Sequence, residues 1–210
     1  EWPSRASASW TRRAAVAAIG LGLGLASRAQ ASDAQSILAA SDAVRNPARP
    51  FAVTVNLIEY RNGKQTEFNT LTVYAKAEAS GGQYRNLIRF VAPARDANKL
   101  MLKNGNDLWF YDPASQASIR LSPQQRLLGQ ASNGDVVTVN LARDYKAELG
   151  GEEEVTDGER VKRRCHRLDL AAVSPDVTYH RVEMWVEVGS ARPVKARFFA
   201  ESGRLLKTAY

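Results

Sequence analysis

The sequence has a single cysteine and only two histidines among its 210 residues. Because a disulfide needs two cysteines, packing alone must hold this fold together. Cys165 and His166 are adjacent, and adjacent side chains of a strand point to opposite faces. The sequence also lacks G-x-S-x-G, H-E-x-x-H and Gly-rich phosphate-binding motifs. It therefore indicates no enzyme, no metal site and no cofactor, and Cys165 is expected to be a small buried residue.

Long apolar runs are also scarce, and the one that exists lies at residues 14–26. It is too short to span the hydrocarbon core of a bilayer comfortably. An arginine pair precedes it and the Ala-Gln-Ala pattern of residues 29–31 follows it, which predicts a cleavable signal peptide over residues 1–31. A retained N-terminal anchor is the alternative. General secretion is favoured over twin-arginine export, because alanines follow the arginine pair.

With Ser32 as the expected first residue of the mature chain, no cysteine is present there to carry a lipid anchor. We therefore expect a protein that is free in the periplasm. The sequence ends at residues 205–210, within a predicted strand. This ending predicts that the domain, residues 32–210, is truncated at its C-terminus.

A strong excess of charge is missing once the expected signal peptide is set aside, since that segment holds four arginines and one glutamate of a chain with net charge +7. The mildly basic remainder does not support nucleic-acid binding. The basic run of residues 160–167 has no interleaved aromatic residues for base stacking. Pairing across a hairpin would set Glu152 opposite Arg163 and Glu153 opposite Lys162. A solvated hairpin therefore explains both the basic run and the acidic residues, which match no EF-hand spacing.

Strand-forming segments separated by turn signals dominate the rest. A helix is expected from Ser32 to about Pro47, and brief helical segments at residues 123–128 and 135–141. Roughly ten strands surround them. The pattern predicts a mainly β (α+β) domain in which a single curved antiparallel sheet forms an open, incomplete barrel. The N-terminal helix and the short helical segments would cover its concave side.

The clearest hairpin signal is Asn62-Gly63, because a type I′ turn needs positive φ at both central positions. Pairing outward from this turn sets Leu57 opposite Phe68 and Phe51 opposite Tyr74. Phe51, Leu57 and the alternate residues between them would share one buried face with Phe68.

A second hairpin surrounds residues 104–106 and contains the run Leu108-Trp109-Phe110-Tyr111, which is apolar on both faces. A two-residue turn at Asn104-Gly105 places Leu100 and Leu102 on the face of Trp109 and Tyr111. A three-residue turn places them with Leu108 and Phe110 instead, since a one-residue shift moves every side chain to the other face. The two-residue turn is preferred here, with Trp109 and Tyr111 pointing inward.

This surplus of apolar strand surface exceeds what one short helix can cover. An under-filled concave side is a ligand cavity, whereas a core filled by the later helical segments is the alternative. The residues predicted to line a lipid-binding cleft are Phe51, Val53, Val55, Leu57, Phe68, Ile88, Phe90, Leu100, Leu102, Trp109 and Tyr111.

Several segments resemble the LolA-like outer-membrane lipoprotein-sorting proteins, in particular a less characterised branch of that superfamily of periplasmic lipoprotein carriers. The segments are residues 89–93 (RFVAP), 99–102 (KLML), 107–113 (DLWFYDP), 119–122 (IRLS), 182–186 (VEMWV) and 203–207 (GRLLK), with a turn at Pro193. The likeness extends over most of residues 33–210. It is a pattern of strands and turns, and no local motif identifies the arginine important in those carriers.

The resemblance implies a soluble periplasmic carrier that holds the acyl chains of a lipoprotein or another envelope lipid and moves them toward the outer membrane, as a chaperone without covalent catalysis. It implies an inner-membrane exporter and an outer-membrane acceptor as partners, and a monomer is expected. A structural or interaction module of an envelope lipid-export complex, acting with an inner-membrane transporter, is the alternative. Neither reading identifies the cargo.

Overall fold

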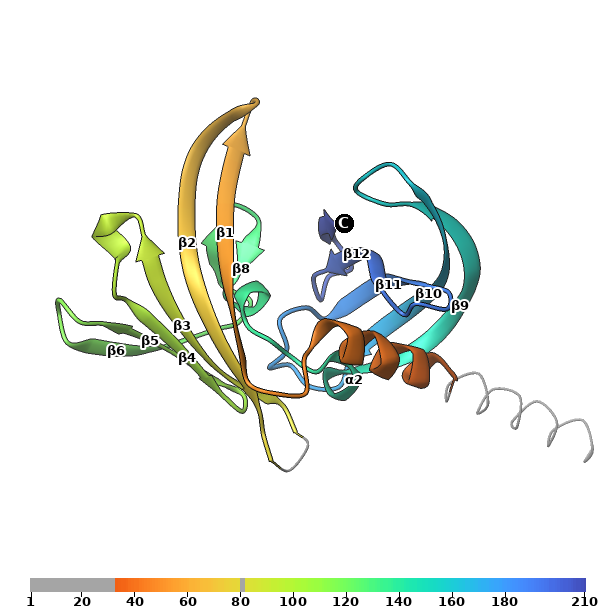
Figure 1. The fold of residues 1–210 in the computed structure, drawn as a ribbon, viewed down its shortest axis with the longest axis horizontal. Helices are drawn as coiled ribbons and strands as arrows, with labels where there is room; N and C mark the ends of the chain where they lie inside the picture. The colour runs from red at the N-terminus through yellow and green to blue at the C-terminus, as the bar shows by residue number, and fades with distance from the viewer. Residues whose placement is uncertain (1–32, 80–81) are drawn as a thin grey trace, which may run out of the picture.

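The computed structural model describes residues 33–79 and 82–210, and the predicted signal peptide and its cleavage site fall outside them. Within the described residues the chain is mostly antiparallel strand, arranged in two large sheets with one helix packed against the second (Figure 1). The first sheet has six strands in sequence order: β1 Phe51–Arg61, β2 Lys64–Ala77, β3 Tyr84–Ala92, β4 Leu100–Asn104, β5 Asp107–Asp112 and β6 Ala117–Leu121.

The second sheet has five strands and also follows sequence order, so each strand pairs with the one that precedes it in the chain. Its strands are β9 Tyr145–Thr156, β10 Lys162–Ala172, β11 Arg181–Glu187, β12 Pro193–Phe199 and β13 Leu205–Ala209. A two-stranded ribbon and short helical turns complete the described residues: β7 Arg126–Leu128, β8 Ala131–Ser132, η1 Ala94–Asp96, η2 Asn133–Val136 and α2 Leu141–Asp144.

The predicted mainly β, open architecture is confirmed: the antiparallel strands do not close into a barrel. Two details of the prediction are wrong. The strands form two large sheets and a ribbon instead of one continuous sheet. Residues 123–128 contain strand β7 and no helix, whereas the predicted segment at 135–141 is only partly helical. A short run of leucine and glutamine shows little periodicity, so the sequence pattern could not decide whether this segment is a helix or a strand.

The N-terminal helix covers residues 33–45 and packs on one face of the second sheet. Ala34 and Leu38 are fully buried in the core that this helix shares with the sheet. The Gln35 side chain fastens the helix to the start of β9, because its amide nitrogen donates to the carbonyl oxygen of Ala142 at 2.7 Å and its oxygen accepts from the N–H of Ala147 at 3.0 Å. The helix thus closes one side of the second sheet.

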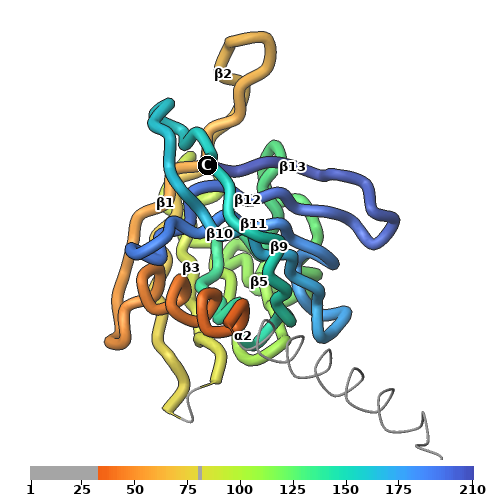
Figure 2. The backbone as a smooth tube through the Cα atoms, turned by 90° about the vertical axis from the view of Figure 1, so that its right-hand side faces the viewer, coloured from red at the N-terminus to blue at the C-terminus, as the bar shows by residue number. Residues whose placement is uncertain are grey.

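The β1–β2 hairpin turns at Asn62-Gly63, as predicted, and both residues have positive φ. Its tip projects beyond the rest of the molecule in both views (Figures 1 and 2). The predicted pairing is wrong by one residue, because a β-bulge between Glu59 and Tyr60 leaves Thr66 without a partner. Leu57 therefore lies opposite Asn69, and Phe68 is placed on the other face of the sheet.

The β4–β5 hairpin has a two-residue loop, which excludes the three-residue alternative. The loop is Gly105-Asn106, one residue later than the predicted Asn104-Gly105, and the resulting two-residue change in pairing leaves every side chain on its predicted face. Leu102 pairs with Trp109 and Leu100 pairs with Tyr111, so these four side chains share a face as predicted. The predicted direction of that face is wrong. Met101 and Leu108 are the buried residues of this hairpin, and the Trp109 face points away from the core. Both faces of the β4–β5 hairpin carry apolar residues, so the alternation along the strands could not show which face is buried.

Candidate functional site

The inner face of the first sheet, which we define as the face that packs against Val136 and Val137, is mostly apolar from β1 to β5. Its fully buried members are Leu71, Val73, Ile88 and Met101, with Leu108 and Phe90 beside them. Toward β1 the cover becomes incomplete. Val55 and Leu57 are only partly buried, and Val53 keeps 44% of its surface exposed. The β1 side of this face therefore presents apolar side chains that the described residues do not fully cover.

The second sheet turns a similar apolar face inward. Leu168, Leu170 and Val186 are fully buried in a core that also includes Met184 and the N-terminal helix. Phe198 continues this face toward the open end of the sheet and stacks at 4.6 Å from the ring of Tyr179. Each sheet therefore has one apolar, largely buried face, and the two sheets stand apart in the ribbon (Figure 1).

Residues 122–140, which we call the strap, run between the two sheets and contain the β7–β8 ribbon and η2 (Figure 1). Three of its valines, Val136, Val137 and Val139, join the core of the first sheet. The strap thus fills part of the space between the inner faces. Next to it, a pocket of about 470 Å³ remains between residues 57–60 of β1 and residues 128–131.

Two amide side chains of the first sheet hold the C-terminal half of the strap. Asn86, which is buried, donates to the Thr138 carbonyl at 3.0 Å and accepts from the Thr138 N–H at 2.8 Å. Gln83 makes the same two contacts with Asn140, at 3.1 and 2.8 Å. Such paired bonds satisfy the strap backbone as a neighbouring strand would. This half of the strap is therefore a fixed part of the first sheet.

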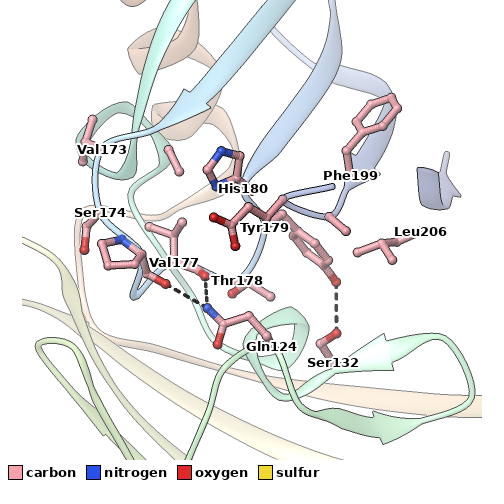
Figure 3. A pocket seen from close by; sticks show the side chains of 14 residues that line it. Gln124, Ser132, Val173, Ser174, Val177, Thr178, Tyr179, His180, Phe199 and Leu206 are labelled. Atoms are coloured by element: carbon pink, nitrogen blue, oxygen red, sulfur yellow. Dashed lines mark hydrogen bonds between the residues drawn. The ribbon is translucent and has the colours of Figure 1, made fainter. Parts of the chain in front are cut away.

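A polar cluster joins the strap to the second sheet. The Tyr179 hydroxyl donates to the Asp135 carboxylate, with O–O distances of 2.8 and 2.9 Å, and lies 3.3 Å from the Ser132 hydroxyl (Figure 3). Lys207 of β13 forms an ion pair with the same carboxylate. Its ammonium lies 4.8 Å from the centre of the Tyr179 ring and 5.0 Å from that of Phe198. The Asp135 carboxylate therefore links η2 to the loop that precedes β11 and to β13.

Burial determines the electrostatics of this cluster. The pKa of Tyr179 is raised well above its usual range, first by desolvation and further by the nearby Asp135 carboxylate. Burial likewise raises the pKa of Tyr145, whose hydroxyl donates to the Tyr179 carbonyl at 2.9 Å. Both phenols stay protonated at neutral pH and act as hydrogen-bond donors. The arrangement supports positioning of the strap.

The largest pocket near this cluster, about 560 Å³, lies between the strap, the loop of residues 173–180 and the β12–β13 turn (Figure 3). Gln124 closes one side of it by donating to the carbonyl oxygens of Pro175, at 3.0 Å, and of Val177. Apolar side chains such as Phe199 and Leu206 line the other side. The pocket therefore opens at the end of the second sheet, away from the residues predicted from the sequence.

The structure divides the predicted cleft residues between the two faces of the first sheet. Six of them lie on the inner face: Phe51, Val53, Val55, Leu57, Ile88 and Phe90. The other five lie on the outer face: Phe68, Leu100, Leu102, Trp109 and Tyr111. The prediction that all eleven share one surface is therefore wrong, because the bulge in β1–β2 and the direction of β4–β5 were not readable from alternation.

The Asp135 cluster and its partners Tyr179 and Lys207 were missed by the sequence reasoning. A local signal existed only for Ser132 and Asp135, whose spacing fits a helix N-terminus and whose contact is a 2.7 Å hydrogen bond from the Ser132 N–H. Lys207 lies 72 positions from Asp135 in the chain, so no local pattern could pair them.

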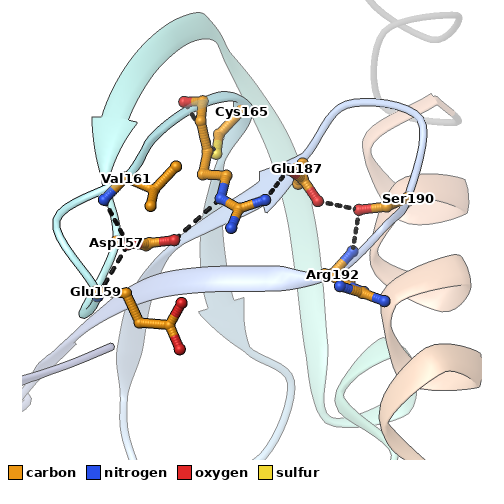
Figure 4. Close-up of polar contacts among 8 residues, drawn as sticks. Asp157, Glu159, Val161, Cys165, Glu187, Ser190 and Arg192 are labelled. Atoms are coloured by element: carbon orange, nitrogen blue, oxygen red, sulfur yellow. Dashed lines mark hydrogen bonds and ion pairs between the residues drawn. The ribbon is translucent and has the colours of Figure 1, made fainter.

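The β9–β10 hairpin is the ion-paired structure that its composition predicted, with a different register. Lys162 pairs with Glu154 at 2.7 Å, and Arg164 pairs with Glu152. Arg163 reaches Asp157 at 3.0 Å and Glu187 at 3.1 Å (Figure 4). The basic run is thus neutralised by neighbouring carboxylates, and the longer loop of residues 157–161 explains the shift from the predicted pairing.

Cys165 is buried, as predicted, in a small cluster with Val155, Trp185 and Val194 on the outer side of the second sheet. Burial raises the pKa of its thiol. A thiol in that state is a poor nucleophile. Within residues 33–79 and 82–210, no group of three or more acidic, histidine or cysteine side chains is placed to hold a metal ion. In the same part of the chain, no helix has both the length and the apolar character to cross a membrane.

Comparison with solved structures finds proteins of the same architecture. A LolA superfamily protein from Nitrosomonas europaea is 33% identical, with a TM-score of 0.71 over 83% of this chain and 75% of that protein. A DUF1329 family protein from Desulfovibrio piger is 22% identical, with a TM-score of 0.71 over 85% of this chain and 77% of that protein. The second likeness shows the fold alone.

A Vibrio parahaemolyticus domain, assigned by its description to outer-membrane lipoprotein sorting, is 17% identical, with a TM-score of 0.69 over 85% of this chain and 76% of that domain. A family model described as an uncharacterized protein matches residues 82–210. No curated protein matches the chain.

Proposed function

Since this chain belongs to the LolA superfamily, we propose that it is a soluble periplasmic carrier of lipid acyl chains. In this proposal it takes a lipoprotein or another envelope lipid from an inner-membrane exporter and moves it toward an outer-membrane acceptor. The export of the chain would depend on the signal peptide predicted at residues 1–31. The carrier works by binding and release, without covalent catalysis.

The observation that carries the proposal is the incompletely covered inner face of β1. Leu57 lines the pocket of about 470 Å³ between β1 and residues 128–131, and Val53 and Val55 retain exposed apolar surface farther along the same face of β1. Each buried methylene of an acyl chain contributes about 0.8 kcal/mol. An acyl chain placed along this face would cover surface that is otherwise in contact with water.

A second reading has support from a different observation. Val136 and Val137 of the strap are buried against the first sheet like residues of an ordinary core. A filled interior is expected of a structural or interaction module in an envelope lipid-export complex. The two readings differ in whether the inner face near β1 can accept a chain without unfolding.

Binding of a fluorescent palmitate analogue to the purified protein tests the carrier proposal. Leu57→Glu places a charge beside the β1 pocket, and we expect it to weaken binding by about tenfold or more, because an unpaired charge is costly to bury. Trp109→Glu is the matched control on the outer face and should bind the analogue as the unchanged protein does.

Circular dichroism of both variants decides between the two readings. A folded Leu57→Glu protein with weakened binding supports the carrier. An unfolded one, together with an unchanged protein that binds no analogue and shows no copurifying lipid by native mass spectrometry, supports the filled module and contradicts the carrier.

A further inference from the structure

The outer face of the first sheet carries a continuous apolar surface that the interior does not use. Tyr74 pairs with Leu87, Leu87 with Leu102, and Leu102 with Trp109, so one row of side chains crosses four strands. Leu100 and Tyr111 form part of the neighbouring row. We call these six residues the apolar patch. Side chains opposite one another in such rows lie within contact distance.

The patch is exposed to solvent. Tyr74, Leu87, Leu102, Trp109 and Tyr111 each keep between 37% and 46% of their surface accessible. Isolated exposed apolar residues are normal, whereas a contiguous set of large ones marks an interaction site. The patch also has relief, because a pocket of about 470 Å³ opens beside Tyr74, Leu87 and Leu102.

The charges around the patch are mainly positive. Lys76 and Arg85 line the same pocket. Arg89 lies opposite Leu100, and Arg120 lies opposite Trp109, so each continues a row of the apolar patch. Arg120 is paired with Asp107, and Arg85 lies 3.7 Å from Glu78, but Arg89 is bonded to the neutral Asn98 side chain. Four cations against two carboxylates leave the surface net positive.

The Lys76–Arg85 pair indicates that a ligand of this surface would be anionic. The two residues are direct cross-strand partners, and both are exposed. Like charges placed directly opposite each other destabilise a sheet. An anionic group bound between them would replace this repulsion with attraction, and an arginine fork suits phosphate in particular.

We propose that the apolar patch and its basic border form a docking surface for an anionic phospholipid bilayer. Tryptophan and tyrosine favour the interface between headgroups and acyl chains, where an apolar ring and a polar edge are both satisfied. Lysine and arginine beside them attract anionic headgroups. The proposal does not depend on cargo binding by the inner face, because it uses the opposite side of the sheet.

Cosedimentation of the full chain with vesicles tests this docking surface. Vesicles of phosphatidylethanolamine with phosphatidylglycerol supply the anionic surface, and vesicles of phosphatidylcholine alone supply the neutral one. We expect stronger binding to the anionic vesicles and weakening with added salt, because screening shortens the range of charge interactions. Every variant retains residues 1–32, so their contribution cancels between variants.

The double variant Lys76→Glu/Arg85→Glu should bind the anionic vesicles about tenfold or more weakly. The matched control is Lys146→Glu/Arg204→Glu, which makes the same change in net charge at exposed residues of the second sheet. Trp109→Glu should also weaken binding, whereas Leu57→Glu should not. Equal binding by both double variants overturns the proposal. So does concentration-dependent self-association that Trp109→Glu abolishes, without vesicle binding, because a second copy of the chain would then be the partner.

Discussion

The two sheets have similar inner faces and contrasting outer faces. Both turn buried aliphatic side chains inward. On the outer face of the second sheet, charges alternate and neutralise one another: Arg181 and Arg197 both reach Glu183, and Arg167 reaches Asp169. The first sheet presents exposed aromatics and leucines in the corresponding place. The same antiparallel architecture can therefore carry an outer face of paired charges, which suits water, or an outer face of exposed apolar side chains, which suits a binding partner.

The largest expected effect on stability comes from a substitution on the buried inner face of the second sheet. Leu168→Ala removes a fully buried side chain from the inner face of the second sheet. We expect a loss of about 2–5 kcal/mol in the free energy of unfolding. Urea denaturation followed by circular dichroism measures it. A loss below that of an exposed substitution would mean that the inner face of the second sheet is not a packed core.

The second-largest effect on stability is expected at the Asp135 cluster, which joins the strap to the second sheet. Tyr179→Phe keeps the ring against Phe198 but removes the hydroxyl that donates to Asp135. We expect a loss of about 1–3 kcal/mol, because a partly buried carboxylate loses a hydrogen bond. Thermal unfolding measures the change, and Tyr74→Phe is the matched control, since that side chain is exposed on the outer face. Equal effects in the two variants would contradict a structural role for the Asp135 cluster.

The ion pairs on the outer side of the second sheet predict that the stability of the protein depends on pH. The pKa of Asp157 is lowered, chiefly by the Val161 N–H and also by Arg163; the pKa of Glu187 is lowered by the Ser190 hydroxyl and by Arg163. Groups whose folded pKa is lowered stabilise the fold above their unfolded pKa of about 4. That stabilisation is lost as the pH falls through the folded values.

Arg163→Met removes the ion pairs and leaves the backbone contacts. The variant should be less stable than the unchanged protein at neutral pH, and its stability should fall less on acidification, so the two curves converge below about pH 3. Unfolding in urea at a series of pH values measures both curves. Parallel curves throughout would show that Arg163 does not set the acid sensitivity of this face.

The smallest effect on stability is expected on the outer face of the first sheet. Leu102→Thr should change the free energy of unfolding by no more than about 0.5 kcal/mol, because the side chain is exposed and threonine suits a strand. Binding of an apolar fluorescent dye should fall in the same variant. A large loss of stability would mean that the apolar patch is part of a core, which would remove the contrast between the outer faces.

Local turn chemistry made much of the fold predictable. Asn62-Gly63 fixed a hairpin, and the apolar alternation around it identified strands. The N-terminal helix was also readable, but the sequence did not show that the second sheet would cover the face of Ala34 and Leu38. Pattern reasoning determines which residues share a face and leaves open which neighbour covers that face.

The candidate site was less predictable for the same reason. The prediction correctly grouped four side chains on one face, namely Leu100, Leu102, Trp109 and Tyr111. That face points away from the strap, and the alternation of apolar residues along a strand does not show which face will be buried. The Asp135–Lys207 contact depends on the path of the strap between the sheets. Contacts of that kind arise only after the elements are assembled.

The bulge at Thr66 reconciles two demands on the β1–β2 hairpin. The Asn62-Gly63 turn sets the alternation from the tip, whereas the buried Leu71 and Val73 set it from the base. One extra residue adjusts the phase between them. The tip can consequently change length in steps of two residues per strand while the base keeps its register, so the projecting end of this hairpin is free to diverge without disturbing the core.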